Sequence, residues 1–249
     1  MRKNVRTLVE IADRHLPLPE PIVEIGSYQV QGQAELADLR SIFAGRDFTG
    51  CDIRPGPGVD RIENVESLTF PHASVGSLIM IDTLEHIQNC HDSLAEAYRV
   101  LRPEGVIIAT SVMDFAIHHH PSDYWRFTPE AFKHLFRCFE QTLVGYQGNP
   151  EKPHTVFAIG VKQSAVDCSV ALAEIEQAYR EANGTLYWRS AQVYYALRDL
   201  LANVRGWNNR MGFELITQPV VSPMRQARRA ALPSELTMAH DPSEERLAA

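Results

Sequence analysis

Apolar runs bounded by turn residues alternate with helix-like patterns through the first two-thirds of the sequence. Four apolar runs have the length and composition of buried strands: 22–25, 47–53, 77–82 and 106–112. Between them, residues 34–43 and 93–105 place apolar side chains at helical spacing. Strands that alternate with helices predict an α/β domain with a mainly parallel sheet and crossover helices.

The residues after the fourth apolar run predict a different arrangement. Residues 113–127 are rich in histidine and aromatic residues and show no period, which indicates a loop. The segment "TPEAFKHLF" starts a helix, because Thr128 can cap it and Pro129 suits its first turn. The segments "FEQTLVGYQ" and "HTVFAIGVK", joined by the turn "GNPEKP", predict an antiparallel hairpin at the end of the sheet.

The repeated strand and helix unit ends near Lys162, so residues 1–162 are expected to form the main domain. Two helical patterns follow, separated by Asn183-Gly184, and we expect 163–221 to be a helical appendage. It would pack on the main domain or on another subunit, which makes a homodimer possible through these helices. Residues 222–249 mix proline, charge and small side chains, which predicts a flexible tail.

Composition narrows the class of protein. The chain is 45% apolar with a formal net charge of −7, which argues against binding to a nucleic-acid backbone. No apolar run approaches the roughly 20 residues that cross a bilayer, so no membrane partner is expected. The N-terminal segment "MRKNVRTLVEIADRHL" predicts an amphipathic helix rather than a secretory signal, and a cytoplasmic protein. The four cysteines lack metal-type spacing and are expected to be reduced thiols.

In the segment "PIVEIGSYQVQG", the first predicted strand is followed by a turn of unusual composition. A dinucleotide-binding turn has the pattern G-x-G-x-x-G, but Tyr28 stands here where the second glycine would be. Its side chain would obstruct a pyrophosphate, so the turn at Gly26 favours a smaller ligand. Glu24 before the turn and Asp52 after the second strand predict a ribose beside positive charge, as in S-adenosylmethionine. Each acid also has a structural alternative: Glu24 could pair with a buried base, and Asp52 could cap a turn.

The sequence resembles class I S-adenosylmethionine-dependent methyltransferases in four segments, which are "VEIGS", "GCDIRPGPGVD", "SLIMIDTLEHI" and "AYRVLRPEGVIIAT". The later "HHHPSDYWRFTPEAF" is similar to a segment in a branch of that family that includes many bacterial members, some presumed to act on sugars or other small metabolites. The resemblance extends to about Lys162. It implies a Rossmann-like fold, S-adenosylmethionine as cofactor and S-adenosylhomocysteine as product.

The resemblance also implies which residues hold the cofactor. They are Glu24, Gly26 and Ser27 around the methionine moiety, Asp52 at the ribose, Ile53, Asn64 and Val65 at the adenine, and Asp82 at the methyl-donor end. Asn64 stands where many members of the family have an acidic residue. Its amide oxygen can accept the same hydrogen bond from the adenine amino group.

Methyl transfer is an in-line displacement that requires mainly alignment, although a hydroxyl acceptor gains from a base. The candidate catalytic residues are His86, His119, His120 and Tyr124. His86 could instead fix the connection after the third apolar run. Arg126 could hold a carboxylate or phosphate of the acceptor, or it could form with Asp123 a buried ion pair that shapes the loop. Trp125 and Phe127 are expected to pack in the core. His118 and His120 could share a metal with Asp123. No second pair of ligands is evident in the sequence, however, so no bound metal is expected.

These observations predict an enzyme that transfers a methyl group from S-adenosylmethionine to oxygen or nitrogen of a small metabolite or glycan precursor. The alternative is a catalytically silent S-adenosylmethionine-binding scaffold or sensor that acts through its C-terminal helices. A nucleotide-dependent oxidoreductase is disfavoured by Tyr28 in the turn.

Overall fold

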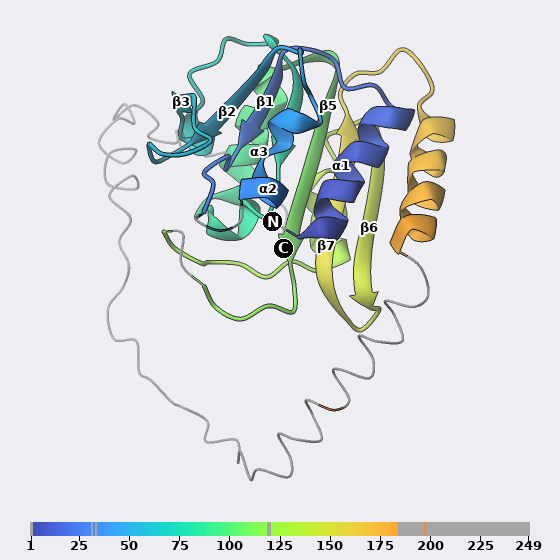
Figure 1. Cartoon of the computed structure of the whole chain (residues 1–249). Helices are drawn as coiled ribbons and strands as arrows, with labels where there is room; N and C mark the ends of the chain where they lie inside the picture. The colour runs from blue at the N-terminus through green and yellow to red at the C-terminus, as the bar shows by residue number, and fades with distance from the viewer. Residues whose placement is uncertain (1, 31, 33, 119–120, 184–196, 198–249) are drawn as a thin grey trace, which may run out of the picture. The chain divides into compact units, whose positions relative to one another are not determined.

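A seven-stranded sheet forms the centre of the computed structural model, which describes residues 2–30, 32, 34–118, 121–183 and 197 (Figure 1). The strands are β1 (Ile22–Ile25), β2 (Phe48–Asp52), β3 (Arg61–Ile62), β4 (Val75–Met80), β5 (Leu101–Val112), β6 (Gln141–Asn149) and β7 (Lys152–Val161). Their order is β3-β2-β1-β4-β5-β7-β6. The pairs from β3 to β5 are parallel, whereas β7 is antiparallel to both β5 and β6. The predicted Rossmann-like sheet with a terminal antiparallel hairpin is confirmed.

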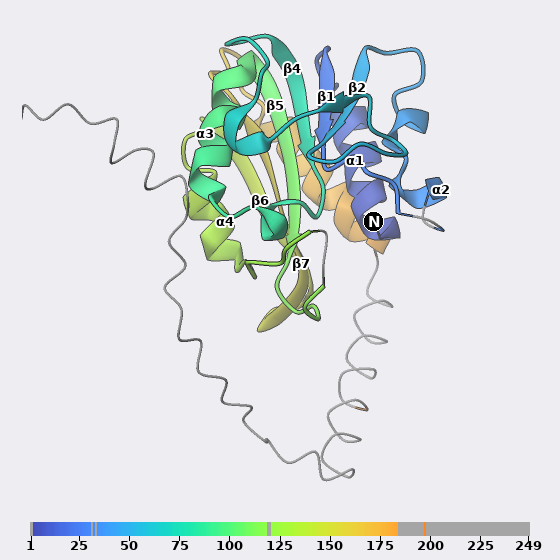
Figure 2. The same ribbon diagram turned by 90° about the vertical axis from the view of Figure 1, so that its left-hand side faces the viewer.

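Helices cover both faces of this sheet. They are α1 (Lys3–His15), α2 (Ala34–Ala37), α3 (Cys90–Val100) and α4 (Pro129–Leu135), with single 3-10 turns η1 (Leu39–Ser41), η2 (Val65–Ser67) and η3 (Leu84–His86). Residues 169–183 are also helical. Figure 2 shows α3 and α4 on one side of the sheet and α1 on the other. Buried side chains of α1 and of residues 169–183 share one core cluster, and those of α3 and α4 share a second.

The alternation of side chains along each strand divides the apolar residues between these two clusters. In β4, Leu78 and Met80 face α3, whereas Ile79 faces α1. All six residues of β4 are buried. A strand covered on both faces needs apolar side chains at successive positions, which is why the central strands are continuous apolar runs in the sequence.

The predicted helix over 34–43 is wrong as a single element. α2 ends at Ala37, and a separate turn η1 begins after Asp38. Asp38 has an extended conformation, and its side chain accepts a hydrogen bond from the Arg40 amide at 3.0 Å. A short carboxylate competes in this way with helical hydrogen bonding, so the helix is interrupted. Leu39 and Phe43 are nevertheless buried as expected, while Leu36 is exposed.

The boundary between α3 and β5 also differs from the prediction. The helix spans Cys90–Val100 rather than 93–105, and the strand begins at Leu101 rather than at residue 106. Leu101 pairs with Val75, and a register irregularity between Val75 and Ser77 accommodates the extra residues of β5. Pairing across the sheet therefore overrides the local helical pattern. The predicted start of α4 is confirmed, because the Thr128 side chain accepts from the Ala131 amide.

The helix at 169–183 packs directly on the main sheet. Leu172, Ile175 and Tyr179 are buried beside α1 and β7. The Tyr179 ring lies edge-on to Phe157 of β7 with 5.1 Å between ring centroids. The second predicted helix, 186–204, lies outside the described residues apart from the helical residue 197, and the predicted tail 222–249 lies entirely outside them.

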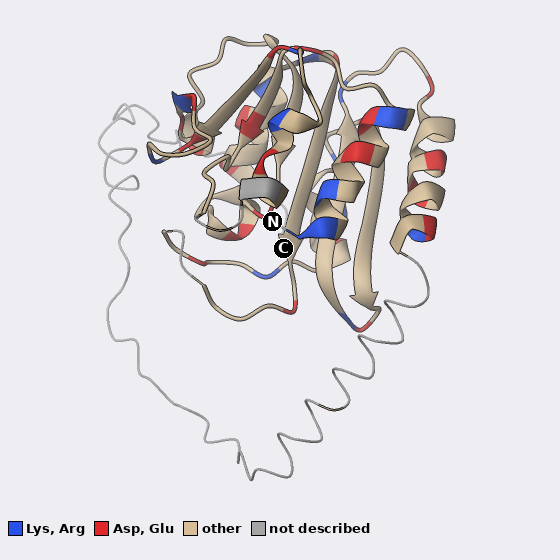
Figure 3. Ribbon diagram, in the orientation of Figure 1, with Lys and Arg blue, Asp and Glu red and all other residues tan. Residues whose placement is uncertain are grey.

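Other expectations from composition can be compared with the described residues. In this part of the chain, no helix combines the length and apolar character required to cross a bilayer. The four cysteines are free thiols, and two of them, Cys51 and Cys90, are buried. Figure 3 shows basic and acidic residues interspersed along α1, so that this helix presents mixed charge on its outer face.

The packing of 169–183 predicts a difference between two substitutions on the same helix. Ile175→Ala removes a fully buried side chain and should lower the free energy of unfolding by about 2–5 kcal/mol. Val170→Ala, at an exposed position, should change it by no more than about 0.5 kcal/mol. Urea denaturation followed by circular dichroism measures both. Equal stability of the two variants would contradict a structural role for this helix.

Candidate functional site

A cleft of about 1170 Å³ opens at the carboxyl ends of β1, β2 and β4. Strand order reverses between β1 and β4, and open parallel sheets bind ligands at such a reversal. All eight predicted cofactor residues line this cleft: Glu24, Gly26, Ser27, Asp52, Ile53, Asn64, Val65 and Asp82. His86 and Tyr124 line it too, whereas His119 and His120 lie outside the described residues.

The turn after β1 requires glycine at position 26. Gly26 has φ of +88°, and a Cβ there would lie 2.5 Å from the Thr83 hydroxyl oxygen. The amides of Gly26 and Ser27 donate to the Cys51 carbonyl at 2.8 and 3.0 Å. These two N–H groups are therefore used by β2 and do not point at a ligand. The first two amides of the turn are therefore not available to hold a phosphate as those of a helix N-terminus do.

Tyr28 turns away from the helix and onto the loop that follows β2. Its ring lies 4.5 Å from the Arg54 guanidinium and covers Gly56, where a Cβ would come within 2.2 Å of the ring. Arg54 in turn lies 3.5 Å from an oxygen of Asp52. Tyr28 and Arg54 together form a wall of the cleft beside Asp52.

Asp52 caps a turn, which is one of the two roles that the sequence left open, and it also lines the cleft. Its Oδ1 accepts a hydrogen bond from the Arg54 amide at 3.0 Å, so it caps the turn after β2. The side chain, 10% exposed, also lines the cleft. A carboxylate has several lone pairs, so capping leaves acceptor capacity for a ligand.

Glu24 is buried in β1, where burial raises its pKa from 4.5 to about 8 and nearby Arg40 opposes that change. Arg40 makes its ion pairs with Asp60 and Asp38, so it is not a dedicated partner of Glu24. Beside Glu24, the buried Ser27 hydroxyl has no hydrogen-bond partner among the described residues. A buried acid and an unsatisfied hydroxyl at one end of a cleft suit a polar, positively charged ligand group.

The opposite wall of the cleft has apolar and amide groups at the positions expected for the adenine. Val65 is buried, and the Ile53 side chain is exposed to the cleft. The side-chain oxygen of Asn64 already accepts a hydrogen bond from the Glu66 amide at 3.0 Å, which caps η2. A second hydrogen bond to that oxygen is still possible, because an amide oxygen carries two lone pairs.

Asp82 lies at the centre of a network that the sequence did not indicate. Its backbone has φ of +46°, and its Oδ1 accepts hydrogen bonds from the Thr110 hydroxyl at 2.8 Å and from Arg2 at 2.9 Å. Arg2 also contacts His154 in β7. Arg2 is separated from Asp82 by 80 residues in the sequence, and no local pattern could have associated the two.

The far end of the cleft is formed by η3 and by the loop 113–127. Glu85 lies there and was not among the site residues predicted from the sequence. It is fully buried, and its carboxyl accepts a hydrogen bond from the Ser111 hydroxyl at 2.6 Å. Burial, followed by the charge of Asp82, raises the pKa of Glu85 to about 8. His86 Nδ1 lies 2.6 Å from the Ser122 carbonyl and donates to it. The Nε2 atom of His86 is therefore the nitrogen able to act as a base or ligand.

Two interactions fix the loop 113–127. Arg126 donates to both oxygens of Asp123, at 2.5 and 2.8 Å, and also to the carbonyls of Phe115 and Ala116. The ion pair thus shapes the loop, as one of the two interpretations proposed. Trp125 is partly exposed rather than in the core, although its indole N–H donates to the Ile87 carbonyl at 2.8 Å. Phe127 is buried as expected.

Comparisons with known proteins bear on this arrangement. A methyltransferase-domain family matches residues 32–109, less than half of the chain. The matched part includes Asp52, Asn64, Asp82 and His86 but not the turn at Gly26. A search of curated proteins found no match.

Solved structures provide a second comparison. 1,6-Didemethyltoxoflavin-N1-methyltransferase from Burkholderia thailandensis, solved with 1,6-didemethyltoxoflavin and S-adenosylhomocysteine, is 17% identical. It has a TM-score of 0.51 over 65% of this chain and 79% of its own. An S-adenosylmethionine-dependent methyltransferase from Archaeoglobus fulgidus is 15% identical, with a TM-score of 0.47 over 63% and 94% of the two chains. The Burkholderia structure supports the predicted Rossmann-like fold.

The burial of Glu24 predicts a pH dependence of stability in the protein without ligand. Between pH 4.5 and about 8 the unfolded chain releases the Glu24 proton while the folded chain retains it, so the free energy of unfolding falls as pH rises. Glu24→Gln should remove this component, on the order of a few kcal/mol across that range. Urea denaturation at several pH values tests it. The exposed Glu130→Gln is the control and should keep the wild-type slope, and an identical slope in Glu24→Gln would contradict the prediction.

Proposed function

We propose that this chain transfers a methyl group from S-adenosylmethionine to oxygen or nitrogen of a small metabolite or glycan precursor. The observation that carries the proposal is the pair of buried acids Glu24 and Asp52, on adjacent strands of one cleft that continues to His86 and Tyr124. The methyltransferase-domain match over 32–109 and the fold support it.

The two acids suit different parts of the cofactor. Asp52 follows the second strand, where a carboxylate accepts hydrogen bonds from a ribose diol. Glu24 lies in the adjacent strand and would face the amino group and sulfonium. A bound cation favours the ionised acid, so cofactor binding below pH 8 is expected to release a proton from Glu24.

The reaction forms a bond between the acceptor atom and the methyl carbon as the bond from that carbon to sulfur breaks. S-Adenosylhomocysteine then leaves with the electron pair of that bond on sulfur. An acceptor hydroxyl must lose its proton, and Nε2 of His86 lines the cleft where such an acceptor would lie. His119 and His120 remain alternative bases. Asp82 would border the methyl-donor end.

The acceptor class is inferred from the other walls of the cleft. Tyr124 and Phe115, both partly exposed, line the end of the cleft next to His86. Aromatic faces of this kind suit a flat heterocycle or the apolar face of a sugar ring. The Burkholderia enzyme is named for methyl transfer to a nitrogen of a small heterocycle, which is compatible with this class. A cytoplasmic location, no nucleic-acid partner and dimerisation through the C-terminal helices remain part of the proposal.

Asp52→Ala should weaken S-adenosylmethionine binding by about tenfold to a hundredfold, because the ribose would lose a charged acceptor. Calorimetry with S-adenosylmethionine and S-adenosylhomocysteine measures the loss. Asp47 is an exposed acid immediately before the first residue of β2, and Asp47→Ala is the matched control, which should bind as wild type does. Wild-type affinity in Asp52→Ala would show that the cofactor site is misplaced. If the protein binds NAD tightly and binds neither S-adenosylmethionine nor S-adenosylhomocysteine, the proposal is refuted.

Substitution of Tyr124 separates an enzyme from a silent scaffold. Tyr124→Ala should leave S-adenosylmethionine affinity unchanged and reduce methyl transfer at least tenfold, because the acceptor loses an aromatic wall. Transfer of radiolabelled methyl from S-adenosylmethionine to the small-molecule fraction of a cell extract provides the measurement. Ile117→Ala, on the same loop and 85% exposed, should retain wild-type transfer. A wild-type protein that binds the cofactor but labels no acceptor would favour the scaffold.

A further inference from the structure

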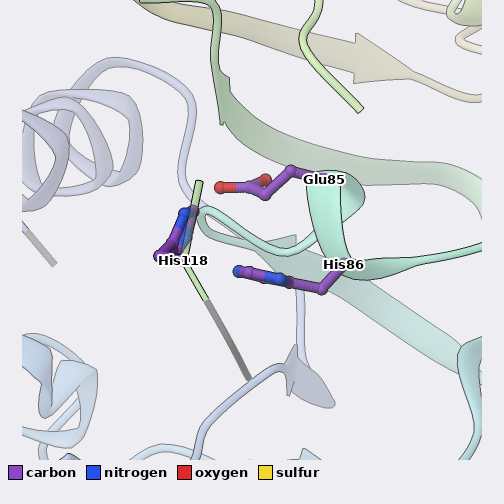
Figure 4. A group of neighbouring side chains, drawn as sticks. All are labelled: Glu85, His86 and His118. Atoms are coloured by element: carbon purple, nitrogen blue, oxygen red, sulfur yellow. The ribbon is translucent and has the colours of Figure 1, made fainter. Parts of the chain in front are cut away.

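Three side chains that can bind a metal converge at the end of the cleft distant from Glu24. Glu85, His86 and His118 each offer one ligand atom, and these atoms lie within 4.8 Å of one another. Figure 4 shows the Glu85 carboxylate directed toward the His118 ring, with the tip of the His86 ring pointing at the same region. The two histidine rings are edge-on, with 4.7 Å between their centroids.

We propose that Glu85, His86 and His118 form a binding site for a divalent transition-metal ion. Two imidazoles and one carboxylate are a common ligand set for Zn²⁺ and other first-row metals that retain open positions. Tetrahedral Zn²⁺ with bonds of about 2.0–2.2 Å places its ligand atoms roughly 3.3 Å apart. Ion binding would therefore bring the three ligand atoms closer together by an ångström or so.

Contacts behind the two histidines orient them for this role. Nδ1 of His86 donates to the Ser122 carbonyl at 2.6 Å, and Nδ1 of His118 lies 3.1 Å from Asp123 and 3.2 Å from the Ala116 carbonyl. Metal-binding histidines characteristically donate their other ring nitrogen to a carbonyl or carboxylate. Both rings therefore have Nε2 as the ligand atom.

Glu85 provides an independent indication of a missing cation. The residue is fully buried, and while one oxygen accepts from Ser111, Oε1 has no hydrogen-bond partner among the described residues. A buried carboxyl oxygen without a partner is costly unless a ligand satisfies it. The charges that face this region are largely paired, since Arg2 binds Asp82 and Arg126 binds Asp123. A dication would neutralise Glu85 without displacing either pair.

The site lines the same cleft as the proposed cofactor residues, next to Tyr124. A metal ion there would have open positions toward the acceptor, and a coordinated hydroxyl is more acidic than a free one. In that case His86 would hold the metal rather than remove the proton itself. This catalytic consequence rests on the proposed function, whereas metal binding does not.

The test is calorimetric titration of the chelator-treated full chain with Zn²⁺ alone. The wild type should bind one Zn²⁺ per chain, and Co²⁺ should give visible absorption bands that Zn²⁺ abolishes. Glu85→Gln and His118→Ala should each bind Zn²⁺ at least about tenfold more weakly. His72→Ala, at an exposed histidine outside the cleft, is the control and should bind as wild type does.

Titration of the same preparations with S-adenosylmethionine separates this inference from the proposed function. Cofactor binding without stoichiometric Zn²⁺ binding by the wild type would overturn the metal site and leave the methyltransferase proposal intact. Zn²⁺ binding that depends on Glu85 and His118, without cofactor binding, would support the metal site and refute the methyltransferase. Stoichiometric Zn²⁺ binding of equal strength in Glu85→Gln and His118→Ala would place the metal elsewhere and overturn the inference. If one variant does not fold, the other still locates the metal, and a wild type that binds no Zn²⁺ overturns the inference without either variant.

Discussion

Parallel pairing of β1 with β2 on one side and β4 on the other is the constraint on which the site depends. The register aligns Ile25 with Cys51 of β2 and with Met80 of β4, so all three strands end at the same edge. The amides of Gly26 and Ser27 then donate to Cys51, and Thr83 fills the space beside Gly26. A shift of one residue in β1 would move Glu24 to the other face of the sheet, and one in β2 would do the same to Asp52.

Burial of acidic groups follows from this arrangement and gives the cleft its chemistry. Glu24 and Glu85 both line the cleft, and burial raises the pKa of each to about 8. Among the described residues neither forms an ion pair with a basic side chain, since Arg40 pairs with Asp60 and Arg2 with Asp82. A protein retains such groups at a cost in folding free energy. A cationic ligand beside each carboxyl, which we propose to be a sulfonium for Glu24 and a metal ion for Glu85, would offset that cost.

The described residues of the loop, 113–118 and 121–127, form no helix or strand, yet several interactions fix them. Asp123 and Arg126 form an ion pair within the loop. The amides of Tyr124 and Trp125 donate to the Glu85 carbonyl, and the Trp125 indole N–H donates to the Ile87 carbonyl. These contacts attach the loop to η3, on which Glu85 and His86 lie. A cleft wall built on irregular backbone can therefore still hold side chains in defined positions.

The sequence alone determined the features that depend on neighbouring residues. Strand and helix alternation, the turn at Gly26, the cap at Thr128 and the acids Glu24 and Asp52 at strand ends all follow from local periodicity and local hydrogen bonding. Tertiary structure decided where residues distant in the chain meet. Strand pairing moved the start of β5 to Leu101, and α1 carried Arg2 to Asp82. The loop brought His118 to Glu85 and His86. Such contacts leave no pattern within a few residues of either partner, because packing of the whole domain creates them.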